Sequence, residues 1–333
     1  MRTAVPTAAV NHISRGGMAW PAALYTMMLS IITAGLLVVP AYASVLVGTQ
    51  PNKKASSSSP RLLSEDFIEL HNSNPASTWT AGKTPFSDMT VDEFSAMMGD
   101  NPKPTEYKPT LVAEWPLQAE WERMTAANIT FPEWFDPRHR WHWCPTLSQI
   151  RDQGMCGSCW AHGVTEALSD RYCTMANITT SFSAHDVSFC CKGCGAGCGG
   201  GDPEKALKYL NATGAFTSTC VPYDQGDHRS HHPWPQPKGT DKCPAKCEDS
   251  ETLAASRHKG TIPYNVPLNK TAIMLELMVN GPSGNQMTVY GDFGSYKGGV
   301  YYTECGKKSP LGKKCQAWGH GTRARPHVHT LLQ

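Results

Sequence analysis

The chain reads DQGMCGSCWA from Asp152 to Ala161, and apolar side chains recur at helical spacing directly after it. Those positions are Trp160, Val164, Ala167, Leu168 and Tyr172. The spacing predicts a buried helix from Ser158 to Cys173. Cys159 would lie at the helix N-terminus, where partial positive charge and free N–H groups favour the reactive thiolate. Gln153 lies six residues earlier and could donate its side-chain amide to a developing oxyanion. One segment therefore predicts both a nucleophile and an oxyanion hole.

The motif CGSCW resembles the signature of papain-family cysteine peptidases, and DQG before it and Ala161 after it extend the likeness. The resemblance implies that Cys159 is the nucleophile and Gln153 the oxyanion donor. His162 departs from it, because the family usually has phenylalanine there. Gly200 and Gly201 resemble the glycines that line the family's cleft, where a substrate backbone approaches closely. A simple turn at these glycines is the alternative interpretation.

The cysteines narrow the resemblance to cathepsin B-like members of the family. All thirteen lie from Cys144 onward, and Cys190-Cys191 are adjacent. The resemblance implies five disulfides: Cys144–Cys173, Cys156–Cys198, Cys190–Cys243, Cys191–Cys194 and Cys220–Cys247. It leaves Cys159 free and gives no role to Cys305 and Cys315. The CGSC spacing also permits a thiol–disulfide oxidoreductase, which a bond between Cys156 and Cys198 would exclude.

Residues 1–43 have the organisation of a secretory signal peptide. Arg2 and Arg15 precede an apolar run over residues 21–39, and Ala41-Tyr42-Ala43 forms a cleavage site. A membrane anchor is the rival interpretation. Entry into the secretory pathway permits disulfides, and we expect a lysosome-like acidic compartment or secretion, with no stable membrane insertion after cleavage. Four Asn-x-Ser/Thr sites, at Asn128, Asn177, Asn211 and Asn269, are candidates for glycosylation.

Residues 44–130 are interpreted as a linker followed by a propeptide. The linker contains SSSSP, a short helix is expected over residues 65–70, and Thr90 with Glu93 forms a capping box that opens a second helix. Residues 78–82 and 86–97 resemble a cathepsin B-type propeptide. The segment has too few apolar residues to fold alone, so we expect it to lie along another part of the chain. The resemblance implies that it lies in the cleft and blocks it until it is removed. The mature chain is expected to begin near residues 128–131.

Residues 131–312 are expected to form the peptidase domain. Helices are predicted over residues 203–210 and 271–279, and strands at 289–290 and 299–302. Helices first and strands later indicate an α+β fold. The resemblance implies the papain-like two-lobed architecture, with a helical lobe carrying Cys159, an incomplete β-rich lobe and a cleft between them. His231 and His232 resemble the paired histidines of the cathepsin B occluding loop, which hold the terminal carboxylate of a substrate. Exposed histidines without a role are the alternative.

The resemblance fails in the tail, residues 313–333. Lys314 stands where the family has its catalytic histidine, and no Asn-Ser-Trp follows. The basic tail shows no strand or helix period. It is either disordered or the product of a reading-frame change just after Gly312. His320 is the only nearby candidate base, and its spacing is wrong.

The resemblance therefore implies a cysteine-type endopeptidase and exopeptidase with impaired activity in this chain. A catalytically inactive homologue that binds peptides or inhibitors is the alternative. Expected partners are peptide or protein substrates and cystatin-type inhibitors. A net charge of +2 suggests no nucleic-acid partner. We expect a monomer with no cofactor and no metal.

Overall fold

The computed structural model describes residues 60–64, 66–99, 111, 113–223, 243–303 and 317–324. The chain divides into two compact units, Met1–Val47 and Gly48–Gln333, and the first lies outside the described residues. Also outside them are most of the linker, His231, His232, Lys314, Cys305 and Cys315. Within the described part, no helix is both long and apolar enough to cross a membrane.

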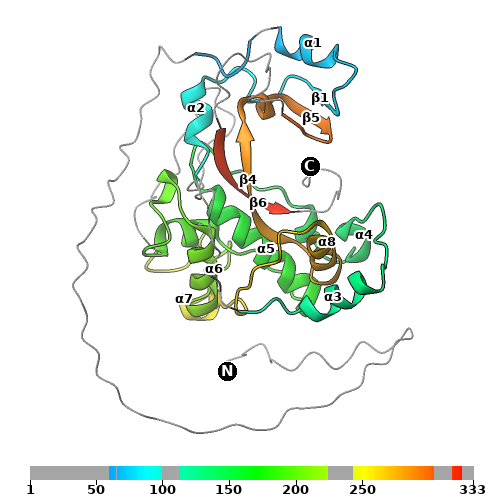
Figure 1. Ribbon diagram of the computed structural model, residues 1–333. Helices are drawn as coiled ribbons and strands as arrows, with labels where there is room; N and C mark the ends of the chain where they lie inside the picture. Colours follow the sequence, from blue (N-terminus) through cyan, green and yellow to red (C-terminus); the bar gives the residue numbers. More distant parts are fainter. Residues whose placement is uncertain are drawn as a thin grey trace, which may run out of the picture. The chain divides into compact units, whose positions relative to one another are not determined.

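The N-terminal part of the described chain contains α1 (Phe67–Asn72), β1 (Trp79–Ala81) and α2 (Val91–Ala96). Helix α2 begins with the predicted capping box, since Thr90 and Glu93 satisfy each other's backbone N–H groups. Strand β1 pairs antiparallel with β5 (Tyr296–Gly299), far along the chain (Figure 1). The indole of Trp79 adds a hydrogen bond to the carbonyl oxygen of Tyr302.

This segment shares its apolar core with the later part of the chain. Its buried members include Leu62, Phe67 and Phe94, and they pack in one cluster with Met155 and Val289. The segment therefore does lie along another part of the protein, as its low apolar content predicted. Most of its stability comes from that contact, because short helices are marginal alone.

Helices dominate the next part. They are α3 (Gln118–Ala126), α4 (Pro137–Arg140), α5 (Cys159–Ala176), α6 (Pro203–Ala212), α7 (Leu253–Ser256) and α8 (Lys270–Val279). Short 3-10 turns cover Pro145–Ser148 and Gly197–Gly199, and a π-helical turn covers Asp186–Cys190. The predicted helices at α5, α6 and α8 are confirmed. Asp202 caps α6 through the N–H of Glu204, and Asn177 ends α5 in a left-handed conformation.

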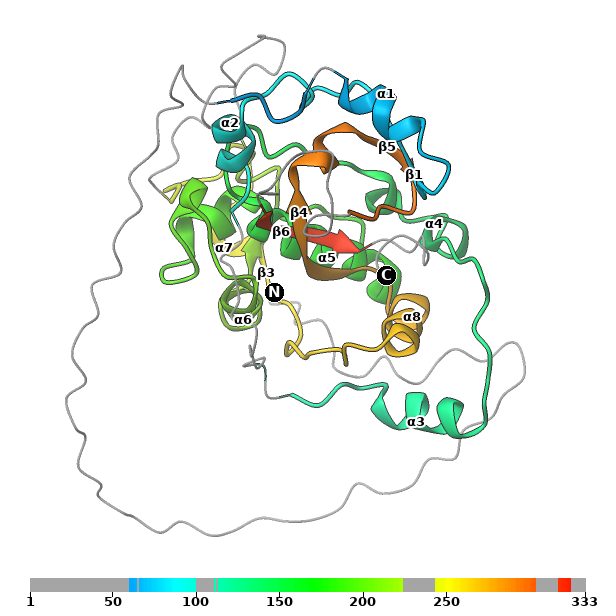
Figure 2. The same cartoon turned by 45° about the horizontal axis from the view of Figure 1, so that its top comes forward.

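The described strands form three two-stranded antiparallel sheets. They are β1–β5, β2 (Ala215–Phe216) with β3 (Arg257–His258), and β4 (Ser283–Tyr290) with β6 (Ala317–Ala324). A further 3-10 turn covers Gly291–Ser295. Figure 2 shows β4 and β6 beside α5. The expectation that the tail contains no strand is wrong. Strand β6 forms there because β4 offers an edge with which all eight of its residues pair.

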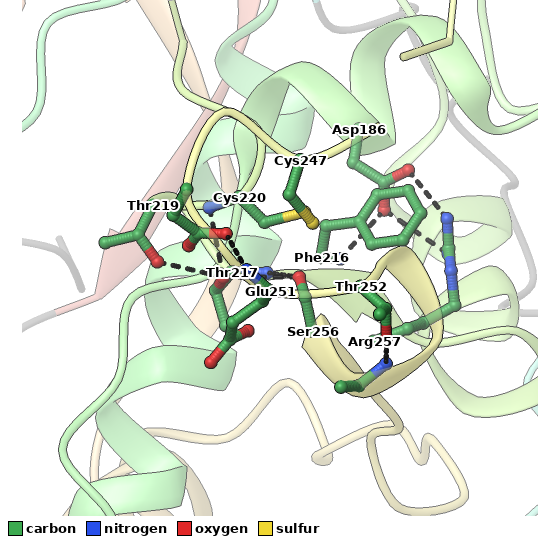
Figure 3. Close-up of a disulfide and its surroundings, with 12 residues drawn as sticks. Asp186, Phe216, Thr217, Thr219, Cys220, Cys247, Glu251, Thr252, Ser256 and Arg257 are labelled. Carbon is green, nitrogen blue, oxygen red and sulfur yellow. Dashed lines mark hydrogen bonds and ion pairs between the residues drawn. A yellow bond between two sulfur atoms is a disulfide. The ribbon is translucent and has the colours of Figure 1, made fainter. Parts of the chain in front are cut away.

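Four of the five expected disulfides are present: Cys144–Cys173, Cys156–Cys198, Cys191–Cys194 and Cys220–Cys247. Figure 3 shows Cys220–Cys247 beside Phe216, whose ring is covered by the Arg257 guanidinium at 3.6 Å. Arg257 in turn pairs with the buried Asp186 at 3.2 Å.

The fifth bond is not formed in this structure, where Cys190 and Cys243 are both free thiols, and their pairing stays a prediction. They are neighbours, but each thiol makes polar contacts instead of a sulfur–sulfur bond. The Cys243 thiol lies 3.7 Å from the carbonyl oxygen of Phe189, and the Cys190 thiol contacts Asp186 and Cys243. Burial raises the pKa of the Cys190 thiol, which keeps it in the protonated form that is slow to react.

Candidate active site

Cys159 is the first residue of α5, one residue inside the predicted start of the helix. Its side chain is buried, and its Sγ accepts a hydrogen bond from the backbone N–H of Gly99 at 3.3 Å. The sulfur therefore lies where the helix N-terminus favours a thiolate. Gly99 belongs to the N-terminal segment, so that segment covers the candidate nucleophile.

Gln153 contacts the same part of the N-terminal segment. Its Nε2 donates to the carbonyl oxygen of Met97 at 2.7 Å and to that of Cys156 at 2.7 Å. The side-chain amide that was predicted to stabilise an oxyanion thus donates to a carbonyl oxygen of the N-terminal segment instead. The turn around Gln153 is fixed by the next residue, Gly154, whose φ is 61° and whose N–H donates to the side chain of Asp152.

Gly201 provides the third contact. Its N–H donates to the carbonyl oxygen of Gly99 at 2.8 Å. A Cβ at Gly201 would lie 2.3 Å from the ring of Trp160, so no other residue fits there without displacement. Gly200 has a φ of 102°, which also favours glycine. The structure thus places Cys159, Gln153 and Gly201 around one stretch of backbone, residues 97–99.

Close packing requires glycine on the segment's side as well. A Cβ on Gly99 would lie only 1.6 Å from the carbonyl oxygen of Gly157. The propeptide resemblance reached Met97 but gave it no contact of its own, and no sequence motif pointed to Gly99. Their role depends on contacts with residues about 60 positions later in the chain, which a local pattern does not encode.

The disulfide Cys156–Cys198 holds the loop before α5 against the glycine-rich turn at Gly197–Gly199, and the N–H of Gly157 donates to the carbonyl oxygen of Cys198 at 3.0 Å. Because of this disulfide, Cys156 has no free thiol. The oxidoreductase alternative is therefore excluded, because it needed Cys156 to exchange with Cys159.

A buried polar network lies next to Cys159. The hydroxyl of Tyr223 donates to the carbonyl oxygen of Gln153 at 3.0 Å and lies 2.7 Å from Ser158 Oγ. His162 Nδ1 lies 3.1 Å from the carbonyl oxygen of Ser158, and its ring packs edge-on against Tyr223. Burial lowers the pKa of His162 from 6.5 to about 4, so the imidazole is neutral at pH 7. Sequence reasoning noticed His162 but missed its contact with Tyr223.

Strand β6 brings the tail close to Cys159, but it turns His320 away. A Cβ on Gly321 would lie 2.8 Å from Trp160 Cα and 2.9 Å from the carbonyl oxygen of Cys159, so Gly321 faces α5. Successive residues of a strand face opposite sides, and His320 therefore faces away from α5, on the side of its partner Met287. Burial lowers the pKa of His320 to about 4, and its Nδ1 has no hydrogen-bond partner among the described residues.

Comparison with known proteins places these features in a family. Residues 131–330 match the profile of the papain family cysteine protease domain, and residues 63–104 match that of the peptidase family C1 propeptide. The first match extends past Gly312 into the tail. Together the two matches agree with the expected papain-like α+β fold preceded by a propeptide.

Individual relatives point to the same branch of the family. The chain is 31% identical to cathepsin B-like cysteine proteinase 6 of Caenorhabditis elegans, covering 84% of this chain and 79% of that protein. It is 33% identical to cathepsin B-like protease 1 of Arabidopsis thaliana over 74% of this chain and 69% of that protein. Among solved structures, procathepsin B S9 of Trypanosoma congolense superposes with a TM-score of 0.63 at 28% identity, covering 79% of this chain and 82% of that chain.

Proposed function

The chain belongs to the papain family of cysteine proteases, and from that premise we propose that it is the precursor of a cathepsin B-like peptidase. Cys159 is its nucleophile and Gln153 its oxyanion donor. Gly200 and Gly201 line the groove that receives the substrate backbone. Residues 97–99 occupy that groove in the precursor and keep substrates out.

One observation carries this proposal. The backbone of residues 97–99 is held at the same time by Cys159, Gln153 and Gly201. A groove that binds a polypeptide backbone through a sulfur, an amide and a glycine N–H is suited to a peptide. The bound segment supports the assignment because its backbone carbonyl groups resemble those of a substrate.

The reaction would begin with attack of the Cys159 thiolate on a peptide carbonyl. The carbon–sulfur bond forms, and negative charge moves to the carbonyl oxygen, where the Gln153 amide and the N–H at the start of α5 stabilise it. The amine leaves with a proton, and water then hydrolyses the thioester. The amine needs a proton donor, and by the resemblance Lys314 stands where the family has its histidine. We therefore propose slow turnover, since oxyanion stabilisation and binding alone leave residual catalysis.

A second function, inhibitor or peptide binding without hydrolysis, is favoured by a specific observation. His320, the nearest candidate base in the tail, faces away from α5. If no other group replaces it, the groove binds peptides or cystatin-type inhibitors without cutting them. Exopeptidase activity would depend on His231 and His232, and their replacement by alanine should then reduce dipeptide release but not internal cleavage.

The remaining parts of the proposal concern the life of the precursor. Residues 1–43 are removed as a signal peptide, residues 44–130 contain the propeptide, and the protein works as a monomer in an acidic compartment or outside the cell. Asn128 and Asn177 are exposed and suited to glycosylation. Asn211 is less suited, because its side-chain amide donates to the carbonyl oxygen of Gly260.

A thiol-directed peptidyl probe tests the central claim. We expect covalent labelling at Cys159, identified by peptide mass mapping, and faster labelling once the propeptide has been removed. Cys159→Ala removes the signal, and Cys243→Ala, which deletes an exposed free thiol, leaves it unchanged. Labelling combined with very low kcat/KM for a peptide substrate would indicate a competent thiolate without a base. Retained inhibitor binding with no labelling at Cys159 would show that the protein is a binding homologue.

A further inference from the structure

A segment between the two family matches has its own attachment to the protein. The propeptide profile ends at residue 104 and the protease profile begins at residue 131. Between them lies α3, which the sequence analysis did not predict. Figure 2 shows α3 beside α8, and side-chain contacts described below join the two. We call residues 113–126 the anchor segment.

The anchor segment donates a hydrogen bond into a buried ionic network. Trp115 is 5% exposed, and its indole N–H donates to Glu276 Oε2 at 2.7 Å. Glu276 is 1% exposed, pairs with Arg171 at 2.5 Å and accepts the hydroxyl of Tyr264 at 2.7 Å. Glu276 Oε2 also accepts from the side-chain amide of Asn280 at 3.0 Å. Loss of Trp115 would therefore remove one of the two side-chain donors to this oxygen of a buried carboxylate, which costs stability.

The anchor segment also covers apolar surface. Helix α8 reads KTAIMLELMV and is apolar on nearly all sides, so it needs packing partners on more than one face. Trp115 packs on Ala272 and Leu275 of α8. The Trp121 indole donates to Thr271 Oγ1 at 2.9 Å. Ala113 adds a parallel bridge to Tyr264. Without these residues the outer face of α8 would be exposed to water.

This attachment is separate from the inhibitory one. The cluster around Trp115 consists of Trp115, Leu117, Trp121, Met124, Phe131, Tyr264, Val266, Ala272 and Leu275. Among described residues it has no member from 60–99, whose core lies instead with Met155 and Val289. Release of residues 60–99 from the groove therefore need not disturb the contacts on α8.

We propose that the anchor segment is a permanent part of the mature protein and stays on α8 after the inhibitory segment has been removed. This differs from the expectation that the mature enzyme starts near residues 128–131. Ile129 and its neighbours are exposed, so a protease can reach the chain there. Even then, Trp115 and Trp121 hold the cut segment in place without a covalent link.

Limited proteolysis tests this without requiring the protein's own activity. The full chain is digested briefly with thermolysin, separated by size exclusion under native conditions, and then denatured for mass spectrometry. We expect the peptide that contains Trp115 and Trp121 to remain with the fragment that contains Cys159, whether joined to it or merely bound. A folded Cys159 fragment that elutes without that peptide overturns the proposal. Because thermolysin does the cutting, an inactive chain gives the same result, and failure of the proposed function would not affect it.

A pair of conservative variants identifies what holds the segment. Trp115→Phe keeps an aromatic ring but removes the donor to Glu276, and we expect cleavage within residues 113–131 to become roughly tenfold faster, because cleavage follows the population of the detached state. Trp134→Phe is the matched control, because Trp134 is 52% exposed. Cleavage of this variant within residues 113–131 should be as fast as that of the wild type. Equal rates for both variants would show that the Glu276 hydrogen bond does not hold the segment, against the proposal.

Discussion

Replacing His162 by phenylalanine should make the protein less sensitive to acid. His162 is buried beside Cys159, and burial lowers its pKa from 6.5 to about 4. Between these two values the unfolded chain binds a proton at this position and the folded chain does not. Stability from the neutral imidazole is therefore complete above pH 6.5 and is lost as the pH falls towards 4.

The magnitude follows from the size of the shift. A difference of about 2.5 pH units corresponds to about 3 kcal/mol across the whole window, and to about 2 kcal/mol at pH 5. Phenylalanine does not titrate, but it loses the hydrogen bond to the carbonyl oxygen of Ser158, which costs about 1 kcal/mol. We therefore expect His162→Phe to be slightly less stable than the wild type at pH 7.5 and more stable at pH 5.

Urea unfolding followed by tryptophan fluorescence at both pH values measures this difference. The free energy of unfolding of the wild type should fall by about 2 kcal/mol more than that of His162→Phe between pH 7.5 and pH 5. His142→Phe replaces an exposed histidine and should leave the wild-type pH dependence unchanged. Parallel pH profiles for the wild type and His162→Phe would refute the reasoning, because they would mean that His162 titrates alike in the folded and unfolded chains.

Two further changes test the contacts around the groove and the disulfide framework. Gly99→Ala would place a Cβ 1.6 Å from a backbone oxygen of Gly157, and such overpacking costs about 1–3 kcal/mol. Labelling of Cys159 by iodoacetamide in the full chain should then be roughly tenfold faster. An unchanged rate would mean that residues 97–99 do not control access to the Cys159 thiol. The double variant Cys220→Ala/Cys247→Ala opens a loop with a sequence separation of 27 residues. Its free energy of unfolding, measured by heat or urea, should be about 3–4 kcal/mol lower than that of the wild type. A decrease below about 1 kcal/mol would indicate that the unfolded chain is already restricted in this loop.

The features that were predictable from sequence are those encoded within a few residues. The capping box at Thr90 and a helix beginning at residue 203 were both predicted, and both are present, the second capped by Asp202. Caps satisfy backbone groups through side chains three residues away or fewer, so the sequence alone specifies them. The start of α5 was predicted to within one residue for a different local reason, the helical spacing of apolar residues, since Ser158 makes no side-chain capping hydrogen bond.

Helix α3 was missed although a local signal was present. Leu117, Trp121 and Met124 recur at helical spacing, but the preceding prolines favoured an extended interpretation of the region. Pro116 lies before the helix, where proline does no harm. The bond between Cys190 and Cys243 is a different case: the two thiols are neighbours but free in the structure, and whether neighbouring thiols are oxidised is not determined by their position in the sequence.

Strand β6 could not have been predicted from its own residues, because its sequence, AWGHGTRA, contains two glycines and no alternation of apolar and polar residues. Its pairing with β4 and its packing on α5 create the strand, and both are long-range. The glycines allow that packing, since the backbone at Gly321 lies within van der Waals distance of Trp160. In a strand, a shift of one residue would turn His320 towards α5.

That shift is blocked by the same close contact that holds β6 in place. A Cβ at position 321 already falls 2.9 Å from the carbonyl oxygen of Cys159, so an imidazole on this face would overlap the start of α5. A base could approach Cys159 only if the strand lay farther from the helix, with larger side chains between them. The described part of the tail therefore completes the sheet in a way that turns His320 away from α5, and residues 317–324 contain no other histidine that could act as a base for Cys159.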